Sequence, residues 1–272
     1  MADAGEQTIE IDGRRFSWQS LSDGPPLLLI NGYAASSADW DPTFLATLGG
    51  SFELICPDNR GVGGSELGDA GELTVDTMAS DLERLLDACA LARASVVGWS
   101  MGGFVAQRLA LRSPARVGAL VLLASAPPGP SGVPAAPEAM RALVDHSGTP
   151  REQASRLIAL LFPPELALAI DREFGELVAE ARAGLAPSTL AAQERVLDEW
   201  VATEQPAPGA DAPPVLIVCG SEDVVLPPAN ANALAALWPH ARVERIAGGG
   251  HAFMAKEPER VARLIASFAL DG

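Results

Sequence analysis

The run Gly98-Trp99-Ser100-Met101-Gly102 has the residue types and the spacing of a nucleophilic serine. A serine placed between a strand and a helix must adopt strained backbone geometry, and only glycine is small enough at the flanking positions. The strain lifts the hydroxyl clear of the sheet, where it could attack a carbonyl carbon. Alone the pattern is weak, since a G-x-S-x-G string occurs by chance in roughly one chain in ten of this length. Its interpretation therefore depends on the neighbouring segments.

The segments around this run fit the turn that such a serine needs. Residues Ala94–Val97 are short and partly β-branched, as in a buried strand. Residues Gly103–Arg112 carry apolar side chains three to four positions apart, which predicts a helix. An apolar run at Val117–Ala124 predicts the next buried strand. The serine is therefore expected at a strand-turn-helix junction inside a β-α-β unit.

One of the three histidines has the position of a catalytic base. A serine hydroxyl is a poor nucleophile at neutral pH and needs a base, usually a histidine oriented by a carboxylate. His146 falls in a helical segment, and His240 leads into a strand, as a surface or turn residue would. His251 follows Gly248–Gly250 in a loop after the last predicted strand, at the same sheet edge as Ser100. Position and elimination therefore predict His251 as the base.

The orienting carboxylate is expected in a loop after a strand. Val215–Cys219 is an apolar strand that leads into two adjacent acids, Glu222 and Asp223. Asp223 is the stronger candidate because it comes three residues after the turning Gly220, where a side chain can double back toward the histidine. Glu222 is the fallback. The predicted order along the chain is serine, acid, histidine, which is the order expected of one particular fold.

Strands and helices alternate along most of the chain, which predicts a mostly parallel sheet with helices on both faces. Strands are expected at Thr8–Asp12, Phe16–Ser20, Leu27–Ile30, Phe52–Cys56, Ala94–Val97, Val117–Ala124, Val215–Cys219 and Arg242–Ile246. Helices are expected at Val75–Ala90, Gly103–Arg112, Ala229–Leu237 and Glu257–Phe268.

The alternation stops after residue 126. Up to about residue 208 only helical patterns occur, at Glu138–Asp145, Arg151–Leu161, Glu165–Ala183 and Ser188–Thr203. We therefore expect a core domain of residues 1–126 and 209–272. Residues 127–208 would form a helical lid over the carboxyl edge of its sheet.

Composition narrows the possible classes of protein. The 272 residues are 48% hydrophobic, enough for one large core, and the net charge of −16 argues against nucleic-acid or anionic-membrane partners. Apolar runs such as Pro26–Ile30 are far shorter than the roughly 20 residues that span a bilayer. Residues Met1–Glu6 show no secretory signal, so a cytoplasmic location is expected. Phosphate-binding, dinucleotide-binding and metal-ligand motifs are missing from the sequence, so neither a cofactor nor a metal is implied.

Four ordered motifs make the chain resemble the α/β-hydrolase family, of the lidded esterase and lactonase kind. They are the serine motif Gly98–Gly102, the acid loop Gly220–Pro227, the histidine loop Gly248–His251, and the D-x-R-G-x-G-x-S run Asp58–Ser65. The resemblance implies an α/β-hydrolase fold, with a mostly parallel eight-stranded sheet flanked by helices. It also implies a helical lid inserted after the sixth strand. In the Asp58–Ser65 run, Asp58 and Arg60 are expected to form a structural ion pair and turn, not a catalytic group.

The resemblance also implies an oxyanion hole, made by two backbone N–H groups. One is that of Met101, and the other comes from the loop after Leu27–Ile30. That loop usually begins His-Gly in the family, whereas here it reads Asn31-Gly32-Tyr33, so the second donor is carried over to Tyr33. Asn31, Gly32 and Trp99 are expected to line the substrate pocket.

The leading hypothesis is a serine hydrolase of a small or medium apolar carboxylic ester or lactone, acting through Ser100, His251 and Asp223. Apolar residues Leu157–Phe162 of the lid favour an apolar substrate. A second hypothesis keeps the triad but assigns cofactor-free haloperoxidase or perhydrolase activity, or carbon–carbon bond hydrolysis. A third is a ligand-binding protein that keeps the fold without turnover.

Overall fold

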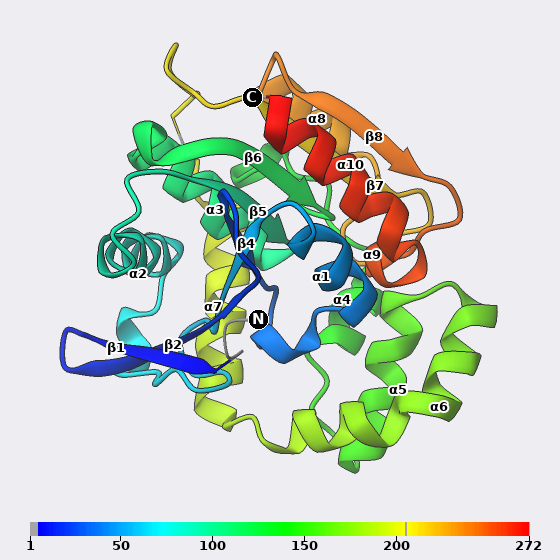
Figure 1. Ribbon diagram of the computed structural model, residues 1–272. Coiled ribbons are helices and arrows are strands. Elements are labelled where there is room, and N and C mark those ends of the chain that lie inside the picture. Colours follow the sequence, from blue (N-terminus) through cyan, green and yellow to red (C-terminus); the bar gives the residue numbers. More distant parts are fainter. Residues whose placement is uncertain (1–4, 205, 272) are drawn as a thin grey trace.

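A single eight-stranded sheet forms the centre of the protein (Figure 1). The computed structural model describes residues 5–204 and 206–271. The strands lie side by side in the order β1-β2-β4-β3-β5-β6-β7-β8. Their bounds are β1 Glu6–Ile11, β2 Arg14–Leu21, β3 Pro26–Ile30, β4 Glu53–Pro57, β5 Ala94–Trp99, β6 Val117–Leu123, β7 Val215–Gly220 and β8 Arg242–Ile246.

Only β2 runs against the other strands. The strand β2 pairs antiparallel with both β1 and β4, and every pairing from β4 to β8 is parallel. The carboxyl ends of β3 to β8 therefore meet at one edge of the sheet. Loops that follow these strands are brought together there although they are far apart in sequence, which is where open α/β sheets bind ligands.

Alternating side chains of the strands bury both faces of the sheet. Leu28 and Ile30 of β3 pack on one side, and Leu27 and Leu29 pack on the other, as the two-residue period of a strand requires. The first side is covered by α2 (Val75–Ala88), α3 (Met101–Arg112) and α8 (Asn230–Leu237). The second is covered by α1 (Pro42–Gly49), α9 (Phe253–Lys256) and α10 (Pro258–Asp271).

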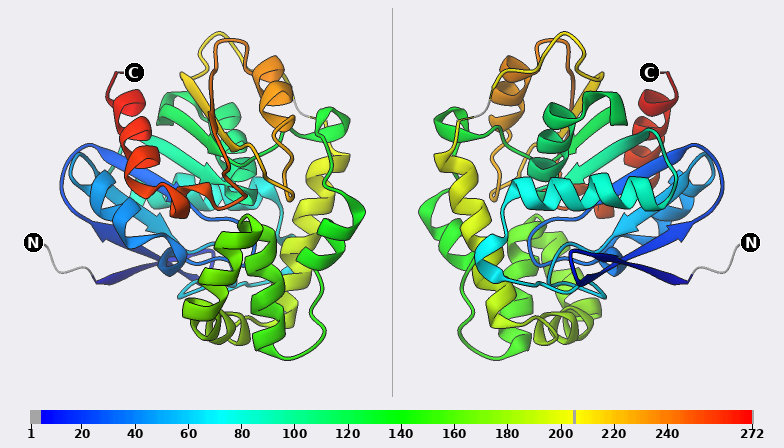
Figure 2. Two further views of the ribbon diagram at one scale, coloured as in Figure 1. Left: turned by 90° about the vertical axis from the view of Figure 1, so that its right-hand side faces the viewer. Right: turned by 90° about the vertical axis from the view of Figure 1, so that its left-hand side faces the viewer.

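Four helices separate β6 from β7, and we call them the lid. They are α4 (Pro137–Leu143), α5 (Pro150–Leu161), α6 (Pro164–Ala183) and α7 (Pro187–Ala202). Each begins with a proline. The fixed φ of proline suits the first turn, and its lack of an N–H costs no hydrogen bond there, because an N–H at that position has no acceptor within the helix. Figure 2 shows the lid gathered on one side of the sheet, toward the bottom of both views. The loops also contain short 3-10 helices, at Ser37–Asp39, Ala70–Glu72, Pro114–Arg116 and Gly129–Ser131.

The structure confirms the predicted fold class, a mostly parallel eight-stranded sheet flanked by helices. The helices α1 and α9 were not predicted. Both are short, and α1 buries only Phe44 and Leu48, so it shows too little of the helical period to be seen in sequence. The division into a core domain and a lid domain stays a prediction, although the four expected helices lie where the sequence placed them.

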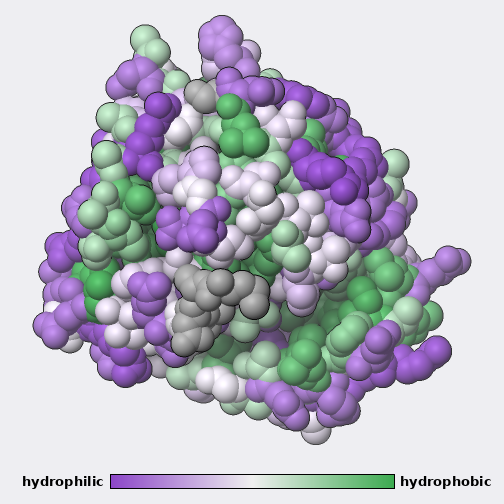
Figure 3. All heavy atoms as spheres, viewed as in Figure 1, coloured by the Kyte–Doolittle hydropathy of each residue, from purple (hydrophilic) through white to green (hydrophobic). Residues whose placement is uncertain are grey.

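The lid also carries apolar side chains on its outer surface. Leu168, Phe174 and Leu177 of α6 are exposed. Figure 3 shows apolar side chains gathered at the lower right, where α5 and α6 lie in Figure 1. Among the described residues, no helix combines the length and the apolar character needed to cross a membrane.

Candidate active site

Ser100 occupies the turn between β5 and α3, with a left-handed φ of 56° and a ψ of −120°. This region is strained for any residue other than glycine, and such strain is typical of a nucleophile elbow. The turn leaves no space for side chains beside it. A Cβ at Gly98 would come within 2.4 Å of the Gly102 carbonyl oxygen, and one at Gly102 within 2.2 Å of the Ile30 carbonyl oxygen. The flanking glycines are therefore required by close backbone packing.

His251 and Asp223 form a buried hydrogen-bonded pair. The distance from His251 Nδ1 to Asp223 Oδ2 is 2.8 Å, and the two residues are 3% and 4% exposed. The other carboxylate oxygen, Oδ1, accepts from the backbone N–H groups of Val225 and Leu226 at 2.8 and 2.9 Å. These bonds fix the carboxylate so that its Oδ2 can accept a hydrogen bond from Nδ1–H. In the neutral imidazole with that tautomer, Nε2 is the nitrogen that can accept a proton. Glu222, the alternative acid, is exposed.

The glycines of the histidine loop allow three chain segments to meet. A Cβ at Gly220 would lie 2.3 Å from the carbonyl oxygens of both Gly249 and Gly250. A Cβ at Gly250 would lie 2.6 Å from the carbonyl oxygen of Leu161, at the end of lid helix α5. Ala252 N–H donates to that same oxygen at 3.0 Å. The loop that carries His251 is therefore held between the acid loop and the lid.

Trp99 links the elbow to the histidine loop. Its indole lies 5.5 Å from the His251 ring between centroids, and its Nε1–H donates to the His251 carbonyl oxygen at 3.0 Å. Ser100 is half-buried, and within the described residues its hydroxyl makes no hydrogen bond, including to His251. Catalytic hydrogen bonds are often long without substrate. The structure thus brings Asp223 and His251 together beside the elbow, with the serine–histidine hydrogen bond not made.

Asn31 and Gly32 begin the loop predicted to supply an oxyanion donor. A Cβ at Gly32 would lie 3.2 Å from Ser100 Cβ, so this loop packs directly on the serine. Asn31 is 1% exposed, and its amide is engaged within the loop, where Nδ2 donates to the Ser36 carbonyl and Oδ1 accepts from Gly32 N–H. The side chain of Asn31 thus shapes its own loop, and its place in a substrate pocket stays a prediction.

Tyr33 reaches from this loop to the lid. Its hydroxyl donates to Glu194 Oε1 of α7 at 2.8 Å, and the same oxygen lies 2.6 Å from His146 Nε2. Burial and the Glu194 carboxylate raise the pKa of Tyr33, so its hydroxyl stays protonated at neutral pH. His146 thus belongs to a contact between lid and core, and His240 is exposed, so neither lies with the predicted triad.

The motif Asp58–Ser65 stabilises the turn after β4. Asp58 accepts from the backbone N–H groups of Ser37 and Gly64 at 2.7 and 2.9 Å. Arg60 pairs with Asp81 of α2, with Nη2 to Oδ1 at 2.8 Å. Asp58 thus binds backbone N–H groups of the turn, and Arg60 forms its ion pair with Asp81 and not with Asp58.

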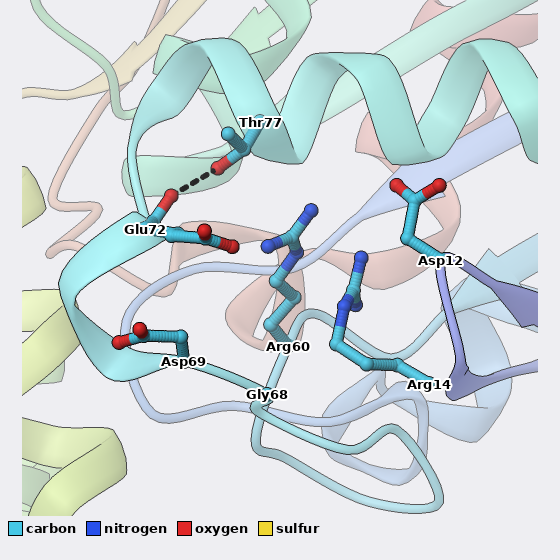
Figure 4. Close-up of a pocket in the computed structure, with 7 residues that line it drawn as sticks. All are labelled: Asp12, Arg14, Arg60, Gly68, Asp69, Glu72 and Thr77. Carbon is cyan, nitrogen blue, oxygen red and sulfur yellow. Dashed lines mark hydrogen bonds between the residues drawn. The ribbon is translucent and has the colours of Figure 1, made fainter.

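A cavity of about 540 Å³ lies over this ion pair (Figure 4). Arg14 and Arg60 project side by side in it, and both bind the buried Asp81. None of the predicted catalytic residues lines it. Its lining residues are Asp12, Arg14, Arg60, Gly68, Asp69, Glu72 and Thr77.

We expect Asp81→Asn to lower the free energy of unfolding by about 3–5 kcal/mol, because it leaves two guanidinium groups without their buried partner. Urea denaturation measures the change. The matched control is Asp76→Asn, since Asp76 also binds two arginines, Arg108 and Arg112, but is half-exposed. Its loss should cost no more than about 1 kcal/mol. Equal losses in the two variants would contradict this account.

We expect Trp99→Phe to be less stable than its control by about 1 kcal/mol, the net value of a hydrogen bond, because His251 loses the donor to its carbonyl. The control is Trp238→Phe. Trp238 is 2% exposed, and its Nε1 has no partner among the described residues, so this change removes the same ring volume and no hydrogen bond. Urea denaturation of both variants gives the difference. No difference would show that the Trp99 bond contributes nothing.

Gln193 of α7 is a site residue that the sequence analysis missed. It is fully buried, and its Oε1 accepts from Ala34 N–H, in the loop after β3, at 2.7 Å. A signal was present in the sequence, because Gln193 falls three residues after Leu190 and three before Val196 on the buried stripe of the helix. A polar residue on such a stripe needs a partner, yet the sequence does not say which.

Comparisons with known proteins agree with this geometry. A family model described as the alpha/beta hydrolase fold matches residues 25–258. A relative from Variovorax paradoxus (strain S110), named as a carbamate hydrolase, RutD, is 30% identical over 256 residues, 91% of this chain and 92% of the relative. The meta-cleavage product hydrolase CumD of Pseudomonas fluorescens IP01 has a TM-score of 0.83 at 22% identity and 97% coverage of each chain. A thermophilic esterase from Thermogutta terrifontis has a TM-score of 0.80 at 26% identity, covering 98% of this chain and 99% of that one.

The chain belongs to the α/β-hydrolase family. The likeness to CumD, at 22% identity, bears on the fold alone. The names of the relatives support a hydrolase activity, whereas the bond that is cleaved and the residues that cleave it are matters of proposal.

Proposed function

We propose that this protein is a serine hydrolase that cleaves a small or medium apolar carboxylic ester or lactone. The observation that carries the proposal is the buried Asp223–His251 hydrogen bond of 2.8 Å, next to a serine on a strained elbow. A serine next to a histidine that a carboxylate orients is the arrangement that activates a hydroxyl as a nucleophile.

In the proposed reaction, Ser100 Oγ attacks the carbonyl carbon and its proton passes to His251 Nε2. The tetrahedral oxyanion accepts hydrogen bonds from the N–H groups of Tyr33 and Met101. When the intermediate collapses, His251 returns the proton to the departing alkoxide. Water then attacks the acyl-enzyme carbonyl, again with His251 as base. The bond between the acyl carbon and Ser100 Oγ breaks, His251 returns the proton to Oγ, and the carboxylic acid is released. Asp223 stabilises the imidazolium in both halves of the cycle.

Two features support these roles. Met101 is the first residue of α3, so its N–H has no acceptor within the helix and lies at the positive end of the helix dipole. Leu161 and Phe162 of the lid pack, together with Trp99, on the apolar cluster beside the histidine loop. This surrounding favours an apolar acyl or alcohol group.

A carbamate is the second candidate substrate, because the relative from Variovorax paradoxus is named as a carbamate hydrolase. The attack on the carbonyl and the oxyanion are the same, and only the atom beside the carbonyl differs. The same triad also serves the haloperoxidase, perhydrolase and carbon–carbon hydrolase alternatives, so the substrate must be found by assay.

The proposal is tested with a fluorophosphonate probe and a substrate panel. We expect the probe to label Ser100, as located by peptide mass spectrometry. The panel comprises p-nitrophenyl esters from acetate to dodecanoate, lactones, a p-nitrophenyl carbamate and peroxide-dependent bromination. Hydrolysis of short or medium esters or lactones supports the leading proposal, and preference for the carbamate supports the second. A protein that is neither labelled nor active on the panel would be a ligand-binding member of the family.

A further inference from the structure

Helix α7 of the lid is docked firmly on the core domain. Trp200 of α7 stacks on Phe104 of α3, with centroids 4.7 Å apart, and its Nε1–H donates to the Ala126 carbonyl at 3.2 Å. At the other end, Thr189 Oγ1 donates to the Gly61 carbonyl at 3.2 Å, and a Cβ at Gly61 would lie 2.5 Å from that hydroxyl. This helix is therefore a fixed platform over the loops that follow β3 and β4.

Gln193 lies between these two anchors and binds both loops. Its Oε1 accepts from Ala34 N–H at 2.7 Å, and its Nε2 donates to the Arg60 carbonyl at 3.3 Å. Asn59 Nδ2 donates to the Asn31 carbonyl at 2.9 Å, which ties the same loops together a second time. Gln193 is fully buried, so water does not compete for these bonds.

The bond to Ala34 constrains the neighbouring Tyr33. Ala34 has a left-handed φ of 55°, an unfavourable conformation for alanine that persists only where surrounding contacts impose it. Two contacts therefore hold Tyr33. Gln193 binds the N–H of the next residue, Ala34, and Glu194 accepts from the Tyr33 hydroxyl. On the other side Gly32 packs against Ser100. The direction of the Tyr33 N–H relative to the serine depends on these contacts.

We infer that Gln193 is a positioning residue of the oxyanion hole: a lid side chain fixes the backbone donor of the core domain. The inference rests on the proposed function and adds a role for the lid in catalysis besides covering substrate. An oxyanion donor acts only if it is aimed at the place where charge develops, and a displacement of about 1 Å can cost about 100-fold in rate.

The test compares Gln193→Leu, Gln193→Glu and the matched control Gln107→Leu. Leucine removes both hydrogen bonds, whereas a glutamate at this buried position is held in its protonated form, which can accept from Ala34 N–H and donate to the Arg60 carbonyl. Gln107 is also a buried glutamine, and its Nε2 donates to two backbone carbonyls away from this loop. The readouts are kcat and KM on an ester, the inhibition constant of an alkyl boronic acid, and amide exchange of residues 31–36 by mass spectrometry.

For Gln193→Leu we expect kcat to fall about 100-fold with KM little changed. Affinity for the boronic acid, whose tetrahedral adduct fills the oxyanion hole, should fall in parallel. Amide exchange of residues 31–36 should rise. Gln193→Glu should recover a large part of kcat, and Gln107→Leu should keep kcat close to wild type even if it unfolds at lower urea.

Three results would overturn the inference. They are unchanged boronic-acid affinity in Gln193→Leu, a fall of kcat shared by Gln107→Leu, or no recovery in Gln193→Glu together with unchanged amide exchange. Failure of the proposed function looks different, because the wild-type protein itself would then neither hydrolyse esters nor bind the boronic acid. In that case Gln193 would hold the loop for a purely structural reason.

Discussion

Ser100→Ala should lower kcat for ester hydrolysis by about 10⁶-fold, because removal of the nucleophile leaves only binding and the oxyanion donors to act on a water molecule. Steady-state assays with a p-nitrophenyl ester measure the loss, and fluorophosphonate labelling should disappear with it. The free energy of unfolding should change little. Alanine and serine both carry a Cβ, so the backbone at φ 56° is equally strained in the two proteins, and the Ser100 hydroxyl makes no hydrogen bond to lose among the described residues.

Ser95→Ala is the matched control for this variant. Ser95 lies on the same strand, β5, and is half-buried like Ser100, but it is near the start of the strand, at the irregularity in its pairing with β6, and away from the elbow. Its activity and labelling should match those of the wild type. Retention of full activity by Ser100→Ala would show that another group attacks the substrate, and the triad proposal would be abandoned.

Asp223→Asn should lower kcat by about 10⁴-fold while the fold remains intact. The asparagine oxygen can still accept from the N–H groups of Val225 and Leu226, so its amide nitrogen turns to His251 Nδ1. A nitrogen that donates there makes Nδ1 the acceptor and puts the ring proton on Nε2. That tautomer cannot take the proton of Ser100, and the transition state also loses the charge that stabilises imidazolium. Steady-state kinetics with an unfolding curve separate this effect from loss of stability.

Glu222→Gln provides the control for Asp223→Asn, because the two acids are adjacent and the sequence left both open. Glu222 is exposed, and among the residues that the structure describes its side chain makes no hydrogen bond, whereas its backbone N–H donates to the Gly249 carbonyl at 2.8 Å. We expect wild-type kinetics from this variant. A large loss in Glu222→Gln with a small one in Asp223→Asn would reverse the assignment of the acid.

Periodicity explains why the elements were predictable. β8 was expected at the observed residues because apolar and polar residues alternate over residues 241–244, and the four lid helices were expected within a few residues of their bounds because amphipathic helices leave a repeating apolar pattern. The prolines that begin each lid helix sharpen the boundaries further. The helix α9 has four residues and α1 buries only Phe44 and Leu48, so neither shows enough of the helical period to be recognised.

The contacts of the side chains that were predicted to line a pocket could be foreseen less well. Trp99 was expected to line the pocket, and the structure places its indole between Trp40 and the His251 ring, with its N–H on the histidine loop. Asn31 turns into its own loop. Both residues are adjacent to functional positions, but the direction of a side chain depends on neighbours that are distant in sequence.

The sequence by itself determined the order of the elements, the strained serine turn, and the candidates for base and acid, because each of these depends on residue type and local spacing. Only the tertiary structure decided between Glu222 and Asp223 as the partner of His251, since adjacent residues in a loop point in different directions. Only the tertiary structure placed Gln193 of the lid on the loop after β3, across 159 residues of chain. Contacts of that kind arise when a helix packs on loops at the sheet edge, and no local pattern of residues encodes the partner.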